Sequence, residues 1–158
     1  MGFRVGIGYD SHRFTKGRRL VLGGIEVPYE YGLQGHSDAD ALLHAVCDAI
    51  LGALGQGDIG EHFPDTDGRY KDIDSTLLMK EVFGLVRKAG YKVGNVDAVV
   101  LAQEPNLKAY KKGMAQIISS CLEMDAAAVN IKAKTNEGMG FVGRKEGVAC
   151  WATVLLIS

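Results

Sequence analysis

The sequence predicts a single α+β domain with one mixed β-sheet packed against helices. The chain has 158 residues, which suits one ordinary domain. Apolar residues make up 47% and charged residues 23%, so a folded core is expected rather than disorder. Short β-branched runs and helical periodicities follow one another in mixed order, which is typical of α+β proteins. Residues 1–158 are therefore expected to form one domain.

The first half of the chain contains two strand patterns and one helix pattern. Alternating residues predict an opening strand over residues 3–8, and a second strand over residues 20–27 is interrupted by two glycines. Ser37 and Asp40 have the spacing of a capping box. Apolar residues then recur at helical intervals from Leu42 to Ala53, so the first helix is expected here and should end before Gly55.

The second half begins with a long loop. Residues 58–74 hold many turn formers, and loops of this length tend to be functional. A second helix is expected from residue 75 through residue 89, and a third from near Pro105 to residue 122. β-Branched runs predict strands over residues 96–102, 129–134 and 148–157, with a glycine-rich loop at 135–147.

Composition excludes several classes of protein. Eighteen Lys and Arg against nineteen Asp and Glu, with no dense basic run, argue against a nucleic-acid partner. The chain has no apolar run long enough to span a membrane, so no membrane partner is expected. The start runs directly into a strand pattern, which favours bacterial cytoplasm over a mature plastid form.

Cys47, Cys121 and Cys150 are expected to be reduced core thiols. The 21 glycines predict tight turns and close backbone approach.

Asp10, His12 and His44 are the candidate metal ligands. Positions i and i+2 of an extended chain face the same way, so Asp10 and His12 should point into one space. His44 lies one turn after Asp40, outside the apolar stripe of its helix. Two histidines and one carboxylate bind Zn²⁺ and leave a fourth position open for substrate. Alone, each fragment could equally be structural, and the sequence does not decide whether Asp40 or Asp48 supports the ligands.

Three further segments could bind a phosphorylated ligand. His36 and Ser37 precede a helix, where backbone N–H groups favour an anion, although Ser37 could be only a cap. Residues 58–67 place short acceptors around a glycine and an aromatic ring, which suits a small polyol or a solvated turn. Residues 134–144 combine three glycines with donors and the carboxylate of Glu137, a plausible Mg²⁺ ligand, although a flexible glycine hairpin is an equal alternative.

Taken together, these motifs resemble one family, the 2-C-methyl-D-erythritol 2,4-cyclodiphosphate synthases. The resemblance runs in order along the chain and is carried by Gly8-Tyr9-Asp10-Ser11-His12-Arg13-Phe14, His36-Ser37-Asp38-Ala39-Asp40-Ala41-Leu42-Leu43-His44-Ala45, Asp58-Ile59-Gly60, His62-Phe63-Pro64-Asp65-Thr66-Asp67 and Gly140-Phe141-Val142-Gly143-Arg144. The chain departs from the family's common pattern at Asn106, Lys134 and Gly138-Met139, which leaves the reaction class intact.

The resemblance implies a homotrimer with its sheets around the three-fold axis and active sites at subunit boundaries. It allows an isoprenoid ligand on that axis. The implied reaction converts 4-diphosphocytidyl-2-C-methyl-D-erythritol 2-phosphate into the cyclic diphosphate and CMP, in the non-mevalonate isoprenoid pathway. The implied cofactors are Zn²⁺, or another divalent metal, and Mg²⁺ or Mn²⁺.

The resemblance also assigns residues to roles. Asp10, His12 and His44 would bind Zn²⁺, and Glu137 would bind the second metal. His36 and Thr135 would contact the transition state. The remaining substrate contacts are Asp10, His12, Ser37, Asp58, Gly60, Phe63, Asp65, Ala102, Pro105, Leu107, Lys108, Lys134, Phe141 and Arg144. By the same resemblance, Asp58, Gly60, Phe63 and Asp65 would contact the sugar. Cytidine would be held by Ala102–Lys108, joined by Lys134 and Thr135. Phe141 and Arg144 would lie towards the trimer axis and substrate.

Two alternatives come from other classes of protein. A zinc phosphohydrolase would use the same ligands to activate water, but it would want a carboxylate base that the sequence does not single out. A non-catalytic nucleotide-binding module would leave the three metal ligands unexplained. Analysis of the reaction products would identify the phosphohydrolase, and a metal assay on purified protein would test the nucleotide-binding module.

Overall fold

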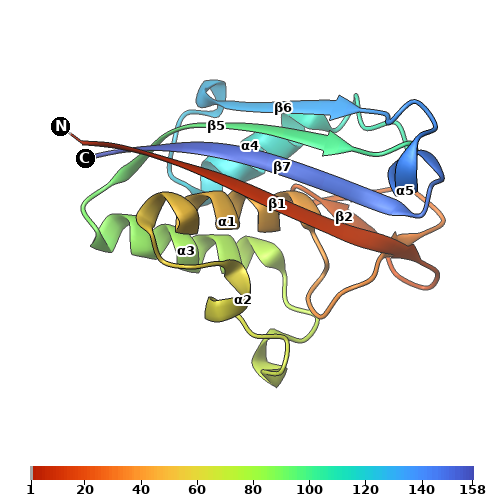
Figure 1. Cartoon of the computed structure of the whole chain (residues 1–158), viewed down its shortest axis with the longest axis horizontal. Helices are drawn as coiled ribbons and strands as arrows, with labels where there is room; N and C mark the ends of the chain where they lie inside the picture. The colour runs from red at the N-terminus through yellow and green to blue at the C-terminus, as the bar shows by residue number, and fades with distance from the viewer. Residues whose placement is uncertain (1) are drawn as a thin grey trace.

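The computed structural model describes residues 2–158 and shows an α+β domain built on a five-stranded mixed sheet (Figure 1). The strand order is β4-β1-β7-β5-β6. These strands are β1 (Phe3–Thr15), β4 (Gly32–Leu33), β5 (Lys92–Leu101), β6 (Val129–Lys134) and β7 (Gly147–Ile157). The β5 and β6 strands pair in parallel, whereas β7 runs antiparallel to both β1 and β5. The predicted fold class and mixed sheet are therefore confirmed.

The helices pack against the sheet and against one another. They are α1 (Ala41–Leu54), α2 (Ile59–His62), α3 (Ser75–Lys88), α4 (Lys111–Cys121) and α5 (Gly140–Gly143). The α1 helix packs on β1 and β7, α4 packs on β6, and α3 packs outside α1 (Figure 1). A separate hairpin joins β2 (Leu20–Leu22) to β3 (Ile25–Val27) through the two glycines that were expected to interrupt one strand.

The first strand is longer than predicted. Apolar alternation ends at Gly8, but the ladder with β7 continues from Phe3 opposite Ile157 to Arg13 opposite Gly147. Asp10 and His12 therefore lie inside a strand and not at its end, because their backbones continue the pairing with β7 although their side chains are polar. The predicted alternation of side chains still holds, and it turns Asp10 and His12 towards α1.

The first helix is capped by Asp40 and not by Ser37, so the capping-box prediction was wrong. The Leu43 N–H donates to Asp40 Oδ1 at 3.0 Å. The N–H groups of Gly23 and Gly24 also donate to the Asp40 carboxylate, at 2.9 and 2.7 Å, which ties the β2–β3 hairpin to the helix start. Burial raises the pKa of this fully enclosed carboxyl. Ser37 instead accepts the N–H of Ala39 in a tight turn.

Close contact between β1 and α1 depends on glycines. A Cβ atom at Gly6 or Gly8 would collide with the backbone of α1 at Ala49 or Ala45. Because the helix lies this near the strand, eleven of its fourteen residues are buried, including His44. The glycine-rich composition is thus partly explained by this contact.

Three short elements occur where loops were predicted. The α2 helix and a 3-10 turn, η1 (Gly68–Tyr70), lie in residues 58–74, and α5 lies in the glycine-rich loop. A helix of four residues is too short to show an apolar period. A second 3-10 turn, η2 (Ala126–Ala128), precedes β6. The α4 helix starts at Lys111 rather than near Pro105, because the preceding segment turns inward and buries Leu107.

The outer face of β1 is apolar and exposed. Phe3, Val5 and Ile7 are 63%, 68% and 70% exposed, and Tyr9 stacks beside Trp151 of β7 with ring centroids 4.6 Å apart. Strand alternation explains the pattern, since the intervening residues face α1. A contiguous apolar surface of this kind marks a site of interaction with another molecule.

Two further observations concern the cysteines and the helices of the described residues. Cys47, Cys121 and Cys150 are free and buried, as expected. Within residues 2–158 no helix has the length and apolar character needed to cross a bilayer.

Candidate metal centre and nucleotide cavity

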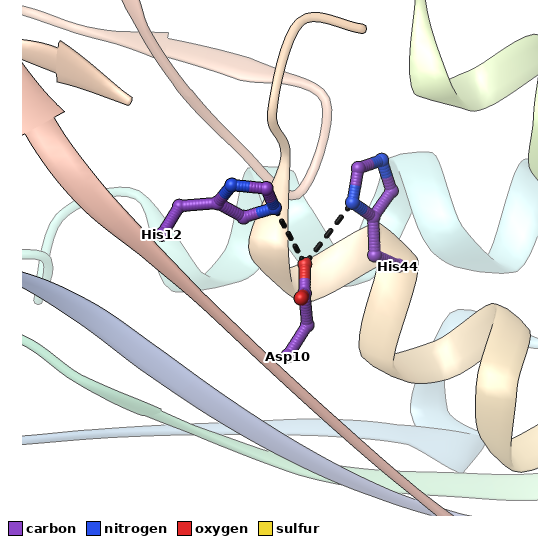
Figure 2. A group of neighbouring side chains, drawn as sticks. All are labelled: Asp10, His12 and His44. Atoms are coloured by element: carbon purple, nitrogen blue, oxygen red, sulfur yellow. Dashed lines mark hydrogen bonds and ion pairs between the residues drawn. The ribbon is translucent and has the colours of Figure 1, made fainter. Parts of the chain in front are cut away.

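Asp10, His12 and His44 converge at one point between β1 and α1 (Figure 2). One ligand atom from each lies within 4.8 Å of the others. Asp10 Oδ2 lies 2.8 Å from His12 Nε2 and 3.0 Å from His44 Nδ1. The structure therefore brings together the three residues that the sequence singled out as metal ligands.

A hydrogen bond outside the centre orients His12. Its Nδ1 lies 2.7 Å from the Gln34 carbonyl oxygen, which can only accept, so Nδ1 carries a proton. His12 Nε2 points inward and is buried. Its short contact with Asp10 is not aligned as a hydrogen bond, and among residues 2–158 this nitrogen has no hydrogen-bond partner. A buried, unpartnered nitrogen of this kind is suited to coordinate a cation.

The electrostatics of the centre place a positive charge beside the carboxylate. Burial alone would raise the pKa of Asp10, but its contacts with His12 and His44 outweigh burial and hold the pKa below 3.8. Burial alone would lower the pKa of His12, but the contact with Asp10 outweighs it and raises the pKa above 6.5. The site therefore favours a cation between these groups, either a proton or a metal ion.

The donor set suits a divalent metal ion. One carboxylate oxygen and two imidazole nitrogens are the ligands of open Zn²⁺ sites, in which a fourth position remains for substrate. The orphaned His12 Nε2 fits this assignment, because a metal ion would satisfy it.

The two acidic residues considered as supports have other roles. Asp40 caps α1, and Asp48 accepts the Ile59 N–H at 2.7 Å, which anchors α2. The side chain that contacts His44 Nε2 most closely is Ser75, whose Oγ lies 2.8 Å away. In the sequence Ser75 indicates only a helix start, and no local spacing links it to His44.

His36 and Ser37 lie beside the centre. Ser37 is buried, and its Oγ lies 3.2 Å from His44 Nε2. His36 Nε2 lies 3.1 Å from the Asp67 carbonyl oxygen. Arg18 donates to the carbonyl oxygens of Gly35 and Ser37 on either side of His36, so this segment is held in place. The role of Arg18 could not be predicted from the sequence, because the backbone carbonyls that it binds leave no side-chain pattern.

The segment expected to hold the sugar forms a surface ledge after α1. Asp58 caps α2 by accepting the Glu61 N–H, and Gly60 lies within that helix. Phe63 packs edge-on against Tyr70 with ring centroids 5.3 Å apart. Asp58, Gly60 and Asp65 are exposed. His62 Nε2 lies 2.8 Å from the Gln56 carbonyl oxygen.

The segment expected to hold cytidine lines a cavity of about 460 Å³. The lining includes all six residues of that prediction, namely Ala102, Pro105, Leu107, Lys108, Lys134 and Thr135. Gln103 and Lys111 line it as well, and Gln103 Oε1 accepts the N–H groups of Asn136 and Gly138 at 3.3 Å. Asp10, His12 and His44 do not line this cavity.

The glycine-rich loop begins at the cavity. Thr135 Oγ1 donates to Glu137 Oε1 at 3.0 Å, and both residues are exposed. Beyond them, Phe141 is 38% exposed and Arg144 donates to Glu146 at 2.6 Å. The chain thus presents the candidate metal centre and the cavity with its loop as two separate groupings.

Comparisons with known proteins agree over nearly the whole chain. A curated 2-C-methyl-D-erythritol 2,4-cyclodiphosphate synthase from Syntrophomonas wolfei is 57% identical over 97% of this chain and 98% of its own. The enzyme of that name from Bacillus subtilis is 54% identical over 98% of each chain. A solved structure, the CDP complex of IspF from Plasmodium falciparum, superposes with a TM-score of 0.87 at 36% identity, over 99% of this chain and 96% of that one.

The profile of the YgbB family matches residues 3–157. Both the match to the profile and the identity to the curated synthases cover the strands and loops that carry the site. The chain therefore belongs to the YgbB family, together with the 2-C-methyl-D-erythritol 2,4-cyclodiphosphate synthases that it matches.

Proposed function

We propose that the chain is a cyclising, CMP-releasing lyase of isoprenoid biosynthesis. It converts 4-diphosphocytidyl-2-C-methyl-D-erythritol 2-phosphate into 2-C-methyl-D-erythritol 2,4-cyclodiphosphate. The observation that carries this proposal is the convergence of Asp10, His12 and His44 in a chain that is 57% identical to a synthase of that name. The bacterial cytoplasmic location stays a prediction.

In the reaction, an oxygen of the 2-phosphate forms a bond to the β-phosphorus. The bond from that phosphorus to the oxygen bridging the α- and β-phosphates breaks, and CMP leaves with this oxygen. Both reactants are anionic, so the protein must fold the substrate back on itself and neutralise charge. A phosphate is already ionised at neutral pH, so the residues need not supply a base.

The chain's residues divide these tasks. We assign cytidine to the cavity between Ala102 and Thr135, which has the size and mixed polar lining of a nucleotide site. The exposed ledge at Asp58, Gly60, Phe63 and Asp65 takes the sugar. His36 and Thr135 orient the phosphates, with Ser37 and the backbone amides before α1 as further donors. Phe141 and Arg144 complete the substrate contacts.

Asp10, His12 and His44 would hold Zn²⁺, and Glu137 would hold Mg²⁺ or Mn²⁺. When bound, these ions supply Lewis acidity and charge neutralisation at the phosphates. Both assignments fit the donors present, since imidazole nitrogens suit Zn²⁺ and a lone carboxylate beside phosphates suits Mg²⁺.

A homotrimer would join the two groupings. The cavity and the metal centre share no residue, which favours an active site completed by a neighbouring copy. The exposed apolar face of β1 and β7 supplies a surface for association around a three-fold axis. The channel formed along such an axis could accept an isoprenoid.

Product analysis tests the proposed reaction. Purified protein incubated with the substrate, Zn²⁺ and Mg²⁺ should release CMP and the cyclic diphosphate in equal amounts, and His44→Ala should release neither. An open-chain phosphate product would support the phosphohydrolase instead. CDP binding without turnover by metal-loaded protein would support a nucleotide-binding module.

A further inference from the structure

A buried serine connects the metal centre to a second carboxylate. Ser75, the first residue of α3, is fully buried, and its Oγ lies 2.8 Å from His44 Nε2. The same hydroxyl donates to Asp38 Oδ1 at 2.5 Å, and the Ser75 backbone N–H donates to Asp38 Oδ2 at 3.0 Å. Asp38, Ser75 and His44 therefore form one continuous chain of hydrogen bonds that leads to the metal centre.

The direction of this chain follows from counting protons. A serine hydroxyl has one proton, and Ser75 donates it to a carboxylate that can only accept. Towards His44 the serine oxygen must then accept, so the imidazole carries its proton on Nε2. A metal-bound imidazole is neutral and has a single N–H, so Nδ1 would offer its lone pair to an ion shared with Asp10 Oδ2, which lies 3.0 Å away.

We propose that Asp38 and Ser75 are positioning residues that hold His44 as an Nδ1 ligand. This inference rests on the metal site proposed above and adds the residues that orient one of its ligands. It also accounts for Ser37, which lies 3.2 Å from the same nitrogen. With Nε2 as the donor, the hydroxyl proton of Ser37 stays free for an anion bound before α1.

The near-isosteric substitution Asp38→Asn should reverse the chain. If the Asn oxygen accepts the Ser75 backbone N–H, the Asn NH₂ replaces Oδ1, loses the Asp40 N–H that Oδ1 accepted, and donates to the serine oxygen. Ser75 must then give its own proton to His44 Nε2, so the imidazole proton moves to Nδ1 and occupies the metal position. Ser75→Ala is milder, because His44 Nε2–H can still donate to Ser37.

The test is Zn²⁺ affinity, measured by chelator competition on the full-length protein. Outer hydrogen-bond partners change metal affinity by about 10- to 100-fold, so we expect Asp38→Asn to weaken Zn²⁺ binding about 100-fold and Ser75→Ala about 10-fold. The matched control is Ser119→Ala, which removes another buried serine that donates to a backbone carbonyl, at Gln116, and should leave the affinity unchanged.

A second measurement separates positioning from folding. In Zn²⁺-loaded protein, long-range ¹H–¹⁵N NMR should show the His44 proton on Nε2 in wild type, and in Asp38→Asn this proton signal should move upfield because its hydrogen bond to Ser75 is weakened. An unchanged Nε2–H signal, or wild-type Zn²⁺ affinity in Asp38→Asn, would overturn the positioning role while leaving the metal site standing. Failure of wild-type protein to bind Zn²⁺ would instead contradict the metal site itself.

Discussion

Gly8 and Ala45 lie so close that a Cβ atom on Gly8 would come within 1.9 Å of the Ala45 carbonyl oxygen. Gly8 is two residues before Asp10, and Ala45 directly follows His44. The same contact that packs the core thus sets the separation between strand and helix at the metal centre.

Gly8→Ala should therefore weaken both the fold and the site. Overpacking a core typically lowers the free energy of unfolding by about 1–3 kcal/mol. Here the added methyl group would meet backbone atoms of Ala45 and Ala49, which cannot rotate away as a side chain could. We expect the free energy of unfolding, measured by urea titration, to fall by at least that amount, and Zn²⁺ affinity to fall with it.

Gly84→Ala is the matched control for this substitution. Gly84 lies on the exposed side of α3 with nothing near its missing Cβ atom, so alanine should stabilise the helix by about 0.5–1 kcal/mol. Equal effects of the two substitutions would contradict the proposed dependence on close packing.

Zn²⁺ binding should depend on pH through His12. The contact with Asp10 raises the pKa of His12 above 6.5, so below that pKa a metal ion must displace a proton. We expect Zn²⁺ affinity to fall by about tenfold per pH unit there and to level off above it, since one proton is released per ion. His62→Ala, which removes a histidine bonded to Gln56, should keep the same profile.

The same groups fix the sign of stability changes in metal-free protein. Asp10, whose pKa is lowered, contributes stability above pH 3.8 that is lost as pH falls through its folded pKa. His12, whose pKa is raised, contributes stability below pH 6.5 that is lost as pH rises through its folded pKa. Urea titrations should show this contribution greatest between the two values, and a flat profile in wild type would refute it.

Filling the cavity should weaken nucleotide binding. Ala133 lines the cavity, and Ala133→Leu would add a branched side chain to its wall. We expect the Kd for CDP, measured by calorimetry, to rise at least about tenfold, because displaced contacts of this size are worth roughly 1–3 kcal/mol. Ala127→Leu, at an exposed position of η2, should bind CDP as wild type does.

Local sequence patterns singled out the three residues that the structure brings together as candidate metal ligands. Asp10 and His12 are two residues apart on a strand, so alternation alone places them together, and the class and order of the main elements follow from periodicity. The burial of His44 was not predictable, because it depends on glycines in β1 that let the helix approach. The strand's extension past Gly8 likewise depends on pairing with β7.

The contact between Ser75 and His44 could not be predicted from the sequence for a related reason. Ser75 lies 31 residues from His44, and its role appears only when α3 packs beside α1. Its local pattern, a serine at a helix start, has a sufficient explanation without any site. The predicted start of α4 was wrong for a similar reason. Pro105 suits the first turn of a helix, but the segment instead buries Leu107 and forms part of the cavity wall.

The apolar face of β1 provides the last prediction, which concerns assembly. Ile7 is 70% exposed at the centre of the row formed with Phe3, Val5 and Tyr9. If this row lies between subunits, Ile7→Glu would bury three charges near the axis of a trimer, which is strongly unfavourable. Analytical ultracentrifugation should show a trimer for wild type and a monomer for Ile7→Glu. Leu77→Glu, at an exposed leucine of α3, should remain trimeric.

Because the cavity and the metal centre share no residue, the monomeric variant should keep Zn²⁺ but lose turnover. Full activity in a monomer would show that one subunit suffices.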